Sequence, residues 1–65
     1  MQLIFTPDTV ADATKFAEFY KKWEFEQDGF FVYECPEQEY DDYYKSVIDS
    51  MEWLEISGKL KIGMP

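Results

Sequence analysis

The segment from Pro36 to Ile56, PEQEYDDYYKSVIDSMEWLEI, constrains the fold more than any other part of this chain. At 100° per residue its large apolar and aromatic side chains fall in one stripe, and most of its acids fall on the opposite side. The stripe contains Tyr40, Tyr43, Tyr44, Val47, Ile48, Met51 and Leu54, and the opposite side contains Asp41, Asp42, Asp49, Glu52 and, at its edge, Glu39. The pattern predicts one long amphipathic helix over residues 37–56 with a strongly acidic outer face.

The formal net charge of the 65-residue chain is −8, and nearly all of it lies in this segment. Between Glu34 and Ile56 there are eight acids and one base, Lys45, which leaves six acids and five lysines elsewhere. A small protein with this charge repels nucleic acid and anionic membranes and favours basic partners. The chain has no arginine and no histidine, which excludes bidentate phosphate binding by arginine and catalysis or metal ligation by histidine.

Length and composition predict a single folded domain over residues 1–65. A chain of this size buries only about 60% of its unfolded surface, and an aromatic content of 20% supplies the large side chains that such a core needs. Cys35 is the only cysteine, so no intrachain disulfide can form. Neither a signal peptide nor an apolar run of membrane-spanning length is present, so we expect a cytoplasmic protein.

The N-terminal third predicts a strand followed by a helix. The apolar run from Gln2 to Phe5 is typical of a strand. Thr6 is a suitable N-cap and Pro7 suits the first helical position, so a helix is expected from Pro7 to about Lys22. Its buried stripe is predicted to contain Val10, Ala13, Phe16, Ala17 and Tyr20, with Phe19 at the flank.

The next segment, Trp23 to Cys35, alternates around the turn signal Asp28-Gly29 and predicts a hairpin. A two-residue loop would place Trp23, Phe25, Phe30 and Val32 on one face. A three-residue loop, Gln27 to Gly29 with Gly29 left-handed, would instead gather Trp23, Phe25, Phe31, Tyr33 and Cys35 on one face and Glu24, Glu26, Phe30, Val32 and Glu34 on the other. The second register is favoured because register follows the buried face. The alternative is that the first helix continues to Glu26 and leaves one strand here.

The C-terminal part predicts a helix end and a last strand. Gly58 is a natural C′ residue for the acidic helix, Lys59 to Ile62 alternates with Leu60 and Ile62 inward, and residues 63–65 are expected to be a frayed end. The predicted fold is therefore α+β: a compact β-α-β-β-α-β sandwich with an antiparallel sheet and two helices on one face, in the order of a ferredoxin-like fold. The fallback is three strands with two helices.

Chemistry at single residues is not expected. The acids lie on a solvated helix face without partners that would separate their pKa values, which argues against general acid–base catalysis. The acidic run does not match the EF-hand template, so no metal site and no cofactor are predicted. Cys35 lies on the inward face and no histidine is available to activate it, so we expect a structural role.

The stretch Gly29-Phe30-Phe31-Val32-Tyr33 faintly resembles the central strand motif of RNA-recognition domains, and the predicted strand order is similar to theirs. The resemblance implies that Phe30 and Val32 on the open face of the sheet stack bases. The leading basic residue of that motif is absent, and the charge of the chain has the wrong sign for phosphates. Phe30 and Val32 are therefore expected to pack against a partner or against the rest of the fold, and they are assigned as a secondary sheet-face patch.

Trp53 is the other large side chain that the predicted core does not explain. It projects at roughly 220° from Tyr40, amid Asp42 and Asp49. Either the helix frays after Glu52 and Trp53 folds inward, or Trp53 is an exposed anchor in an acidic field, the pattern of an interface hot spot. The partner-binding residues are predicted to be Glu39, Asp41, Asp42, Asp49, Glu52 and Trp53.

Together these features predict a small acidic, non-enzymatic binding protein whose helix 37–56 docks on a basic protein surface. Basic protein grooves commonly hold nucleic acid, so the expected partner is a nucleic-acid-binding protein, and the expected action is inhibition by nucleic-acid mimicry. In size, charge and architecture the chain is similar to small phage-encoded antirestriction, anti-CRISPR and polymerase-blocking inhibitors. No direct nucleic-acid or membrane binding is expected. The alternative is a generic interaction or antitoxin-like module, with a homodimer as one form, in which the acidic face serves only solubility.

Overall fold

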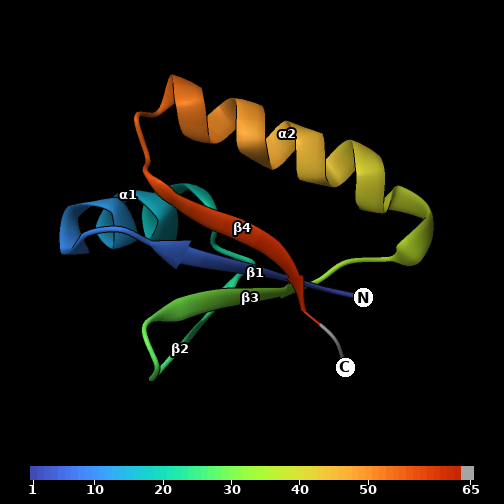
Figure 1. The fold of residues 1–65 in the computed structure, drawn as a ribbon, viewed down its shortest axis with the longest axis horizontal. Coiled ribbons are helices and arrows are strands. Elements are labelled where there is room, and N and C mark those ends of the chain that lie inside the picture. Colours follow the sequence, from blue (N-terminus) through green and yellow to red (C-terminus); the bar gives the residue numbers. More distant parts are fainter. Residues whose placement is uncertain (64–65) are drawn as a thin grey trace.

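A computed structural model of the chain describes residues 1–63, so Met64 and Pro65 of the expected frayed end lie outside the described residues. The elements are β1 (Gln2–Pro7), α1 (Val10–Phe19), β2 (Glu24–Glu26), β3 (Phe30–Glu34), the short 3₁₀ helix η1 (Glu37–Glu39), α2 (Tyr40–Trp53) and β4 (Gly58–Gly63). The strands form one antiparallel sheet in the order β2-β3-β1-β4 (Figure 1). This is the predicted β-α-β-β-α-β arrangement, so the fallback with three strands is not needed.

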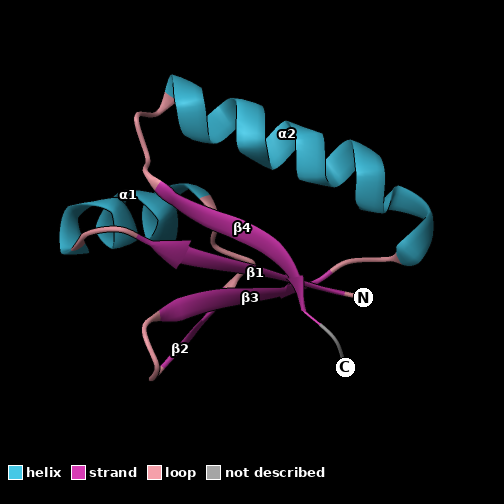
Figure 2. Ribbon diagram, in the orientation of Figure 1, coloured by secondary structure: helices cyan, strands magenta, loops and turns pink. Residues whose placement is uncertain are grey.

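The core lies between the sheet and the two helices (Figure 2). Successive side chains of a strand point to opposite faces, and here Leu3, Phe5 and Phe31 turn one face of the sheet toward α1 and α2. The buried side chains that meet there are Leu3, Phe5, Phe16, Trp23, Phe31, Cys35, Val47, Met51 and Ile56. The prediction of an antiparallel sheet with both helices on one face is therefore confirmed, and Cys35 lies within the core.

The hairpin between β2 and β3 has the three-residue loop. Phe25 pairs with Phe31 and Glu26 pairs with Phe30. Gly29 has a φ of 90°, which a residue without a Cβ adopts at little cost, and its N–H donates to the Glu26 carbonyl at 3.0 Å. Phe25 faces the helices, as predicted, yet remains 58% exposed because β2 is a short edge strand.

Helix α1 differs from the prediction in both its limits and its rotation. β1 continues to Pro7, and the N-cap is Thr9, whose Oγ1 accepts a hydrogen bond from the Asp12 N–H at 3.2 Å. The Asp12 carboxylate in turn accepts from the Ser57 N–H at 3.0 Å and from the Thr9 hydroxyl at 2.7 Å. The prediction of a helix from Pro7 to Lys22 was therefore wrong, because the cap and the bond to Ser57 fix the start of α1 later in the chain.

The same contacts turn Asp12 and Phe16, one helical turn apart, toward the core. Phe16 is fully buried and Ala13 and Tyr20 are half-buried, as predicted. Two other members of the predicted stripe, Val10 and Ala17, lie at the surface, and Val10 is 85% exposed. Their placement in the core was wrong because the inward Asp12 rotates the helix by part of a turn.

Helix α2 is shorter than the predicted helix over residues 37–56. It begins at Tyr40 after η1 and ends at Trp53. Glu55 takes a φ of 57°, its N–H donates to the Glu52 carbonyl at 3.2 Å, and the Ile56 N–H donates to the Met51 carbonyl at 2.9 Å. These two bonds form a Schellman motif with Glu55 at C′, so the assignment of Gly58 to that position was wrong.

Two glycines near the C-terminus have a packing role. Gly58 opens β4, and a Cβ at this position would overlap the ring of Phe5. Gly63 is buried and paired with Gln2, and a Cβ there would press on Ile4. The expectation that the frayed end begins at residue 63 was therefore wrong.

Candidate protein-binding site

Helix α2 is fixed on the core by two tyrosine hydroxyls. Tyr43 Oη accepts a hydrogen bond from Trp23 Nε1 at 3.0 Å, and Tyr44 Oη donates to the Leu60 carbonyl at 3.1 Å. The Tyr43 ring also stacks on Tyr33 with ring centroids 4.8 Å apart. Because the tyrosine side of α2 is held in this way, its acidic side faces solvent.

The predicted acidic residues are all exposed: Glu39 in η1, and Asp41, Asp42, Asp49 and Glu52 in α2. No carboxylate of this set forms an ion pair within residues 1–63. Asp41 and Glu52 lie about 16 Å apart along the helix axis, from the rise of 1.5 Å per residue. The set is thus a row of unpaired carboxylates along α2, which we call the acidic row.

Trp53 is the last residue of α2 and is 88% exposed. The alternative in which the helix frays after Glu52 and Trp53 folds inward is therefore wrong. A large side chain of this kind at the surface of a 65-residue protein leaves apolar area in water. It lies directly beside Glu52 and thus at one end of the acidic row.

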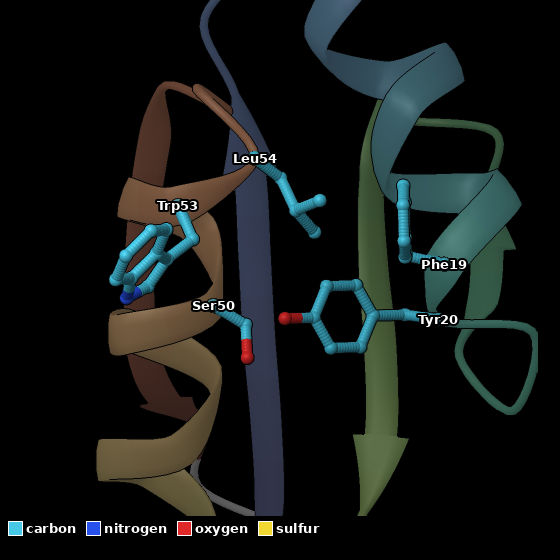
Figure 3. Close-up of a pocket in the computed structure, with 5 residues that line it drawn as sticks. All are labelled: Phe19, Tyr20, Ser50, Trp53 and Leu54. Atoms are coloured by element: carbon cyan, nitrogen blue, oxygen red, sulfur yellow. The ribbon is translucent and has the colours of Figure 1, made fainter.

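A groove between the two helices begins at Trp53. It has a volume of about 330 Å³ and is lined by Phe19, Tyr20, Ser50, Trp53 and Leu54. In Figure 3 Tyr20 reaches from the end of α1 toward Ser50, and Leu54 points into the space between the helices. Phe19 is 60% exposed on the α1 side, whereas the Trp53 ring points away from Tyr20 on the α2 side (Figure 3).

Sequence reasoning missed this groove. It assigned Tyr20 and Leu54 to buried stripes and placed Phe19 only at a flank, because periodicity describes one helix at a time. The available signal was that both helices end in a large aromatic residue, Phe19 and Trp53. That signal indicates a groove only once the two helices are known to lie side by side.

The hydroxyl of Tyr20 is buried and, among the described residues, has no hydrogen-bond partner. Buried hydroxyl groups are normally paired, and an unpaired one costs about 1–3 kcal/mol. The groove is therefore not optimised for the stability of the isolated chain.

Groups with shifted pKa values near the site stay protonated at neutral pH. Burial, with a smaller contribution from the Glu39 carboxylate, raises the pKa of the Cys35 thiol. Burial is also the largest cause of the raised pKa of Tyr40 and of Tyr43. Across residues 1–63, no three or more histidine, cysteine, aspartate or glutamate side chains cluster so that they could hold a metal ion.

The secondary patch lies apart from the acidic row and the groove. Phe30 and Val32 are half-buried on the face of the sheet opposite to α1 and α2. The two predicted binding regions are therefore on opposite sides of the molecule.

The fold and the site define a small α+β domain with a split β-α-β topology and an acidic, tryptophan-tipped helix. Comparisons with protein-family models, curated proteins and solved structures found no match to the chain. No helix within the described residues has both the length and the apolarity that are required to cross a membrane.

Proposed function

We propose that this chain is a non-enzymatic binding protein that docks the acidic row and Trp53 on a basic protein surface. The observation that carries the proposal is the 88% exposure of Trp53 at the end of α2, beside carboxylates that have no ion-pair partner within residues 1–63. Exposed tryptophans are costly in the free protein and are enriched among interface hot spots. Flanking charge adds steering and specificity to such an anchor.

The groove supports the same proposal because it offers a place for an apolar side chain of the partner. Trp53, Phe19 and Leu54 line a space of about 330 Å³ with a largely apolar surface. A partner that carries lysines or arginines around one apolar side chain complements this arrangement. The unpaired Tyr20 hydroxyl at the groove is a further sign that this region is not shaped by stability alone.

The most specific form of the proposal is inhibition by nucleic-acid mimicry. Duplex DNA presents a row of negative charges that basic grooves bind. The acidic row spans about 16 Å on one rigid helix, and Lys45 is the only base in α2. A helix of this kind occupies the groove in which the partner protein binds nucleic acid. It thereby blocks that groove, as an inhibitor of the antirestriction, anti-CRISPR or polymerase-blocking type does.

Charge reversal tests the acidic row. A partner is first captured from lysate with the wild-type chain, and association is then followed as a function of salt. Asp49→Lys combined with Glu52→Lys should slow association and flatten its dependence on salt, because steering is electrostatic. Glu18→Lys combined with Asp28→Lys is the control, because it changes the net charge equally at exposed positions away from α2.

Truncation of the ring tests Trp53. Trp53→Ala should accelerate dissociation by about 30-fold or more, as expected for a hot spot of about 2 kcal/mol. Phe25→Ala removes a ring that is 58% exposed at the far edge of the sheet and serves as the control. Equal effects of the two truncations would show that Trp53 is not the anchor.

Competition decides between mimicry and docking elsewhere. If the captured partner binds nucleic acid, that nucleic acid should compete with this chain for one site. Simultaneous binding without interference would exclude mimicry and leave the acidic row as a steering surface. If the double charge reversal leaves binding unchanged, α2 is only solvated, and the contact lies on the sheet face around Phe30 and Val32.

A further inference from the structure

The open face of the sheet, which points away from both helices, carries a charge gradient. At one edge, β2 presents Glu24 and Glu26, and at the other edge β4 presents Lys59 and Lys61. Two cross-strand rows connect these edges. The first runs Glu24, Val32, Ile4, Lys61, and the second begins with Glu26 and Phe30 and ends with Thr6 and Lys59. The face is therefore acidic at one edge and basic at the other, and between the edges three apolar side chains, Ile4, Phe30 and Val32, lie beside Gln2, Thr6 and Glu34.

The middle of this face is unusual for a solvated sheet surface. One-sided antiparallel sheets normally place polar side chains toward water, whereas β1 and β3 place Ile4, Phe30 and Val32 there. All three are half-buried, and no element within residues 1–63 covers them. An apolar strip bordered by charges is the composition of an interface.

The opposite charges cannot pair within one copy. β2 and β4 are separated by two strands, so their side chains stand about 14 Å apart across the sheet, at about 4.8 Å per strand. Within residues 1–63 none of Glu24, Glu26, Lys59 or Lys61 forms an ion pair. The charge pattern is therefore unsatisfied in the monomer, and a surface with the reversed pattern would satisfy it.

We propose that the open face binds a second copy of this chain, face to face, about a twofold axis that runs roughly parallel to the strands. Rotation about such an axis places β2 of one copy over β4 of the other. Each cross-strand row then lies over the same row of the second copy, with its order reversed. Glu24 then faces Lys61 of the second copy, and Val32 faces Ile4 of the second copy. Glu26 likewise faces Lys59 of the second copy. An axis perpendicular to the strands would place β2 on β2 and set like charges together, so the pattern selects one orientation.

The shape of the face fits this arrangement. Beside β2 the open face has a hollow of about 270 Å³ whose charged lining is Glu24, Glu26 and Glu34 together with one base, Lys22, so acids outnumber bases there. In the proposed dimer a lysine of the opposing β4 enters this hollow. Both acidic rows lie on the outer sides of the dimer, more than two Debye lengths from each other at physiological salt, because each sheet and helix layer is about 10 Å thick.

The area of the face predicts a weak, reversible dimer. Four strands of about five residues span roughly 19 Å by 17 Å, or about 320 Å² of contact for each copy. Stable interfaces bury about 800 Å² for each partner, so we expect a dissociation constant of about 0.1 mM. Binding of a partner at the acidic row does not depend on this dimer, because the two surfaces lie on opposite sides of the sheet.

Sedimentation equilibrium over a concentration series to about 1 mM tests the proposal. The apparent mass should rise above the monomer value of 7.8 kDa with increasing concentration. In a parallel NMR titration with the chain itself, concentration-dependent shifts should be confined to the open face, around Ile4, Val32 and Lys61. A chain that stays monomeric at about 1 mM, or shifts that map to α1 and α2, would overturn the proposal.

Exchange of the charges tests the orientation. Glu24→Lys with Glu26→Lys should weaken self-association by about tenfold or more although it lowers the net negative charge, and so should Lys59→Glu with Lys61→Glu. A mixture of the two variants should recover association, because both edges of one face are then basic and both edges of the other face are acidic. Glu18→Lys with Glu37→Lys, two exposed positions outside the sheet and outside the acidic row, is the control and should leave self-association intact. Failure of the mixture to associate would overturn the proposed pairing.

Discussion

Asp12 is the only buried charged side chain that the structure describes among residues 1–63. The hydrogen bond from the Thr9 hydroxyl, and then the bond from the Ser57 N–H, lower the pKa of its carboxyl group. A carboxyl group whose folded pKa is depressed stabilises the fold above its unfolded pKa, and this contribution is lost as the pH falls through the folded pKa. At the scale of single residues, Asp12 therefore links the start of α1 to the strand connection at Ser57 in a pH-dependent way.

The corresponding prediction concerns Asp12→Asn. The variant should melt below the wild type at neutral pH, and the difference should shrink as the pH is lowered from about 6 to about 2. Melting curves followed by circular dichroism measure it, with Asp8→Asn as the control because Asp8 is exposed and its side chain is not in the cap. If the difference in melting temperature stayed constant over this pH range, the ionised carboxylate would add nothing to the stability of the fold.

Glu55 is the only non-glycine residue among those described that has a positive φ. A left-handed conformation costs a residue with a Cβ about 1 kcal/mol, and a negative charge at a helix C-terminus also opposes the helix dipole. Glu55→Gly should therefore raise the free energy of unfolding by about 1 kcal/mol. In urea titrations Glu55→Gln should gain less, because it removes the charge and keeps the Cβ. If Glu55→Gln raised the free energy of unfolding as much as Glu55→Gly, the whole effect would come from the charge and none from the left-handed backbone.

At the scale of the element, α2 combines a well-anchored inner side with an outer side that is unfavourable for the isolated helix. Its last turn contains Glu52 and no base, next to Asp49 and Glu55. Acids at the C-terminal end oppose the helix dipole and repel one another. A helix under selection for stability alone would place lysines there, so the retained acids are consistent with the proposed binding surface.

Glu52→Gln removes one of these repelling charges from the last turn of α2. The variant should gain about 0.5 kcal/mol at low salt, and the gain should fall as salt screens the repulsion. The melting temperature of the wild type should itself rise with moderate salt. Asp41→Asn is the matched control, since Asp41 lies in the first turn, where the dipole favours a negative charge, and its removal should not stabilise the fold. A loss of stability in Glu52→Gln would show that Glu52 supports the structure.

At the scale of the whole molecule, stability depends on one aromatic cluster around Phe16. Its ring centroid lies 4.2 Å from that of Phe5, 4.4 Å from that of Tyr20 and 4.8 Å from that of Phe31. Trp23 meets the same ring edge-on at 5.1 Å. The cluster joins α1, β1, β3 and the loop after α1, so its loss affects every layer of the fold.

Phe16→Ala should cost about 3–5 kcal/mol, as is typical of large truncations in cores. A domain of this size has roughly 5 kcal/mol to lose, so the variant should be largely unfolded at 25 °C. Phe19→Ala, three residues later and 60% exposed, should change the free energy of unfolding by less than about 1 kcal/mol. Denaturant titration of both variants distinguishes the two positions, and similar costs would show that α1 is rotated differently.

Much of the fold was predictable because it depends on signals within a few residues. The alternation from Trp23 to Cys35 and the Asp28-Gly29 turn set the hairpin register, and the Tyr40 to Leu54 stripe set the inner side of α2. The exposure of the acidic row followed from the same periodicity. The groove did not follow, because its walls come from α1 and α2, which are distant in the sequence.

The sequence by itself determined the order of elements, the hairpin register and the acidic outer side of α2, because turn chemistry and periods of 2 and 3.6 residues act locally. Tertiary structure decided the rotation of α1, since Asp12 is held by Ser57, 45 residues away. It also decided where α2 ends, because burial of Ile56 against the core draws Glu55 into the left-handed cap. The tertiary structure also produces the charge gradient of the open face, because only the strand order β2-β3-β1-β4 places Glu24 and Lys61 at opposite edges.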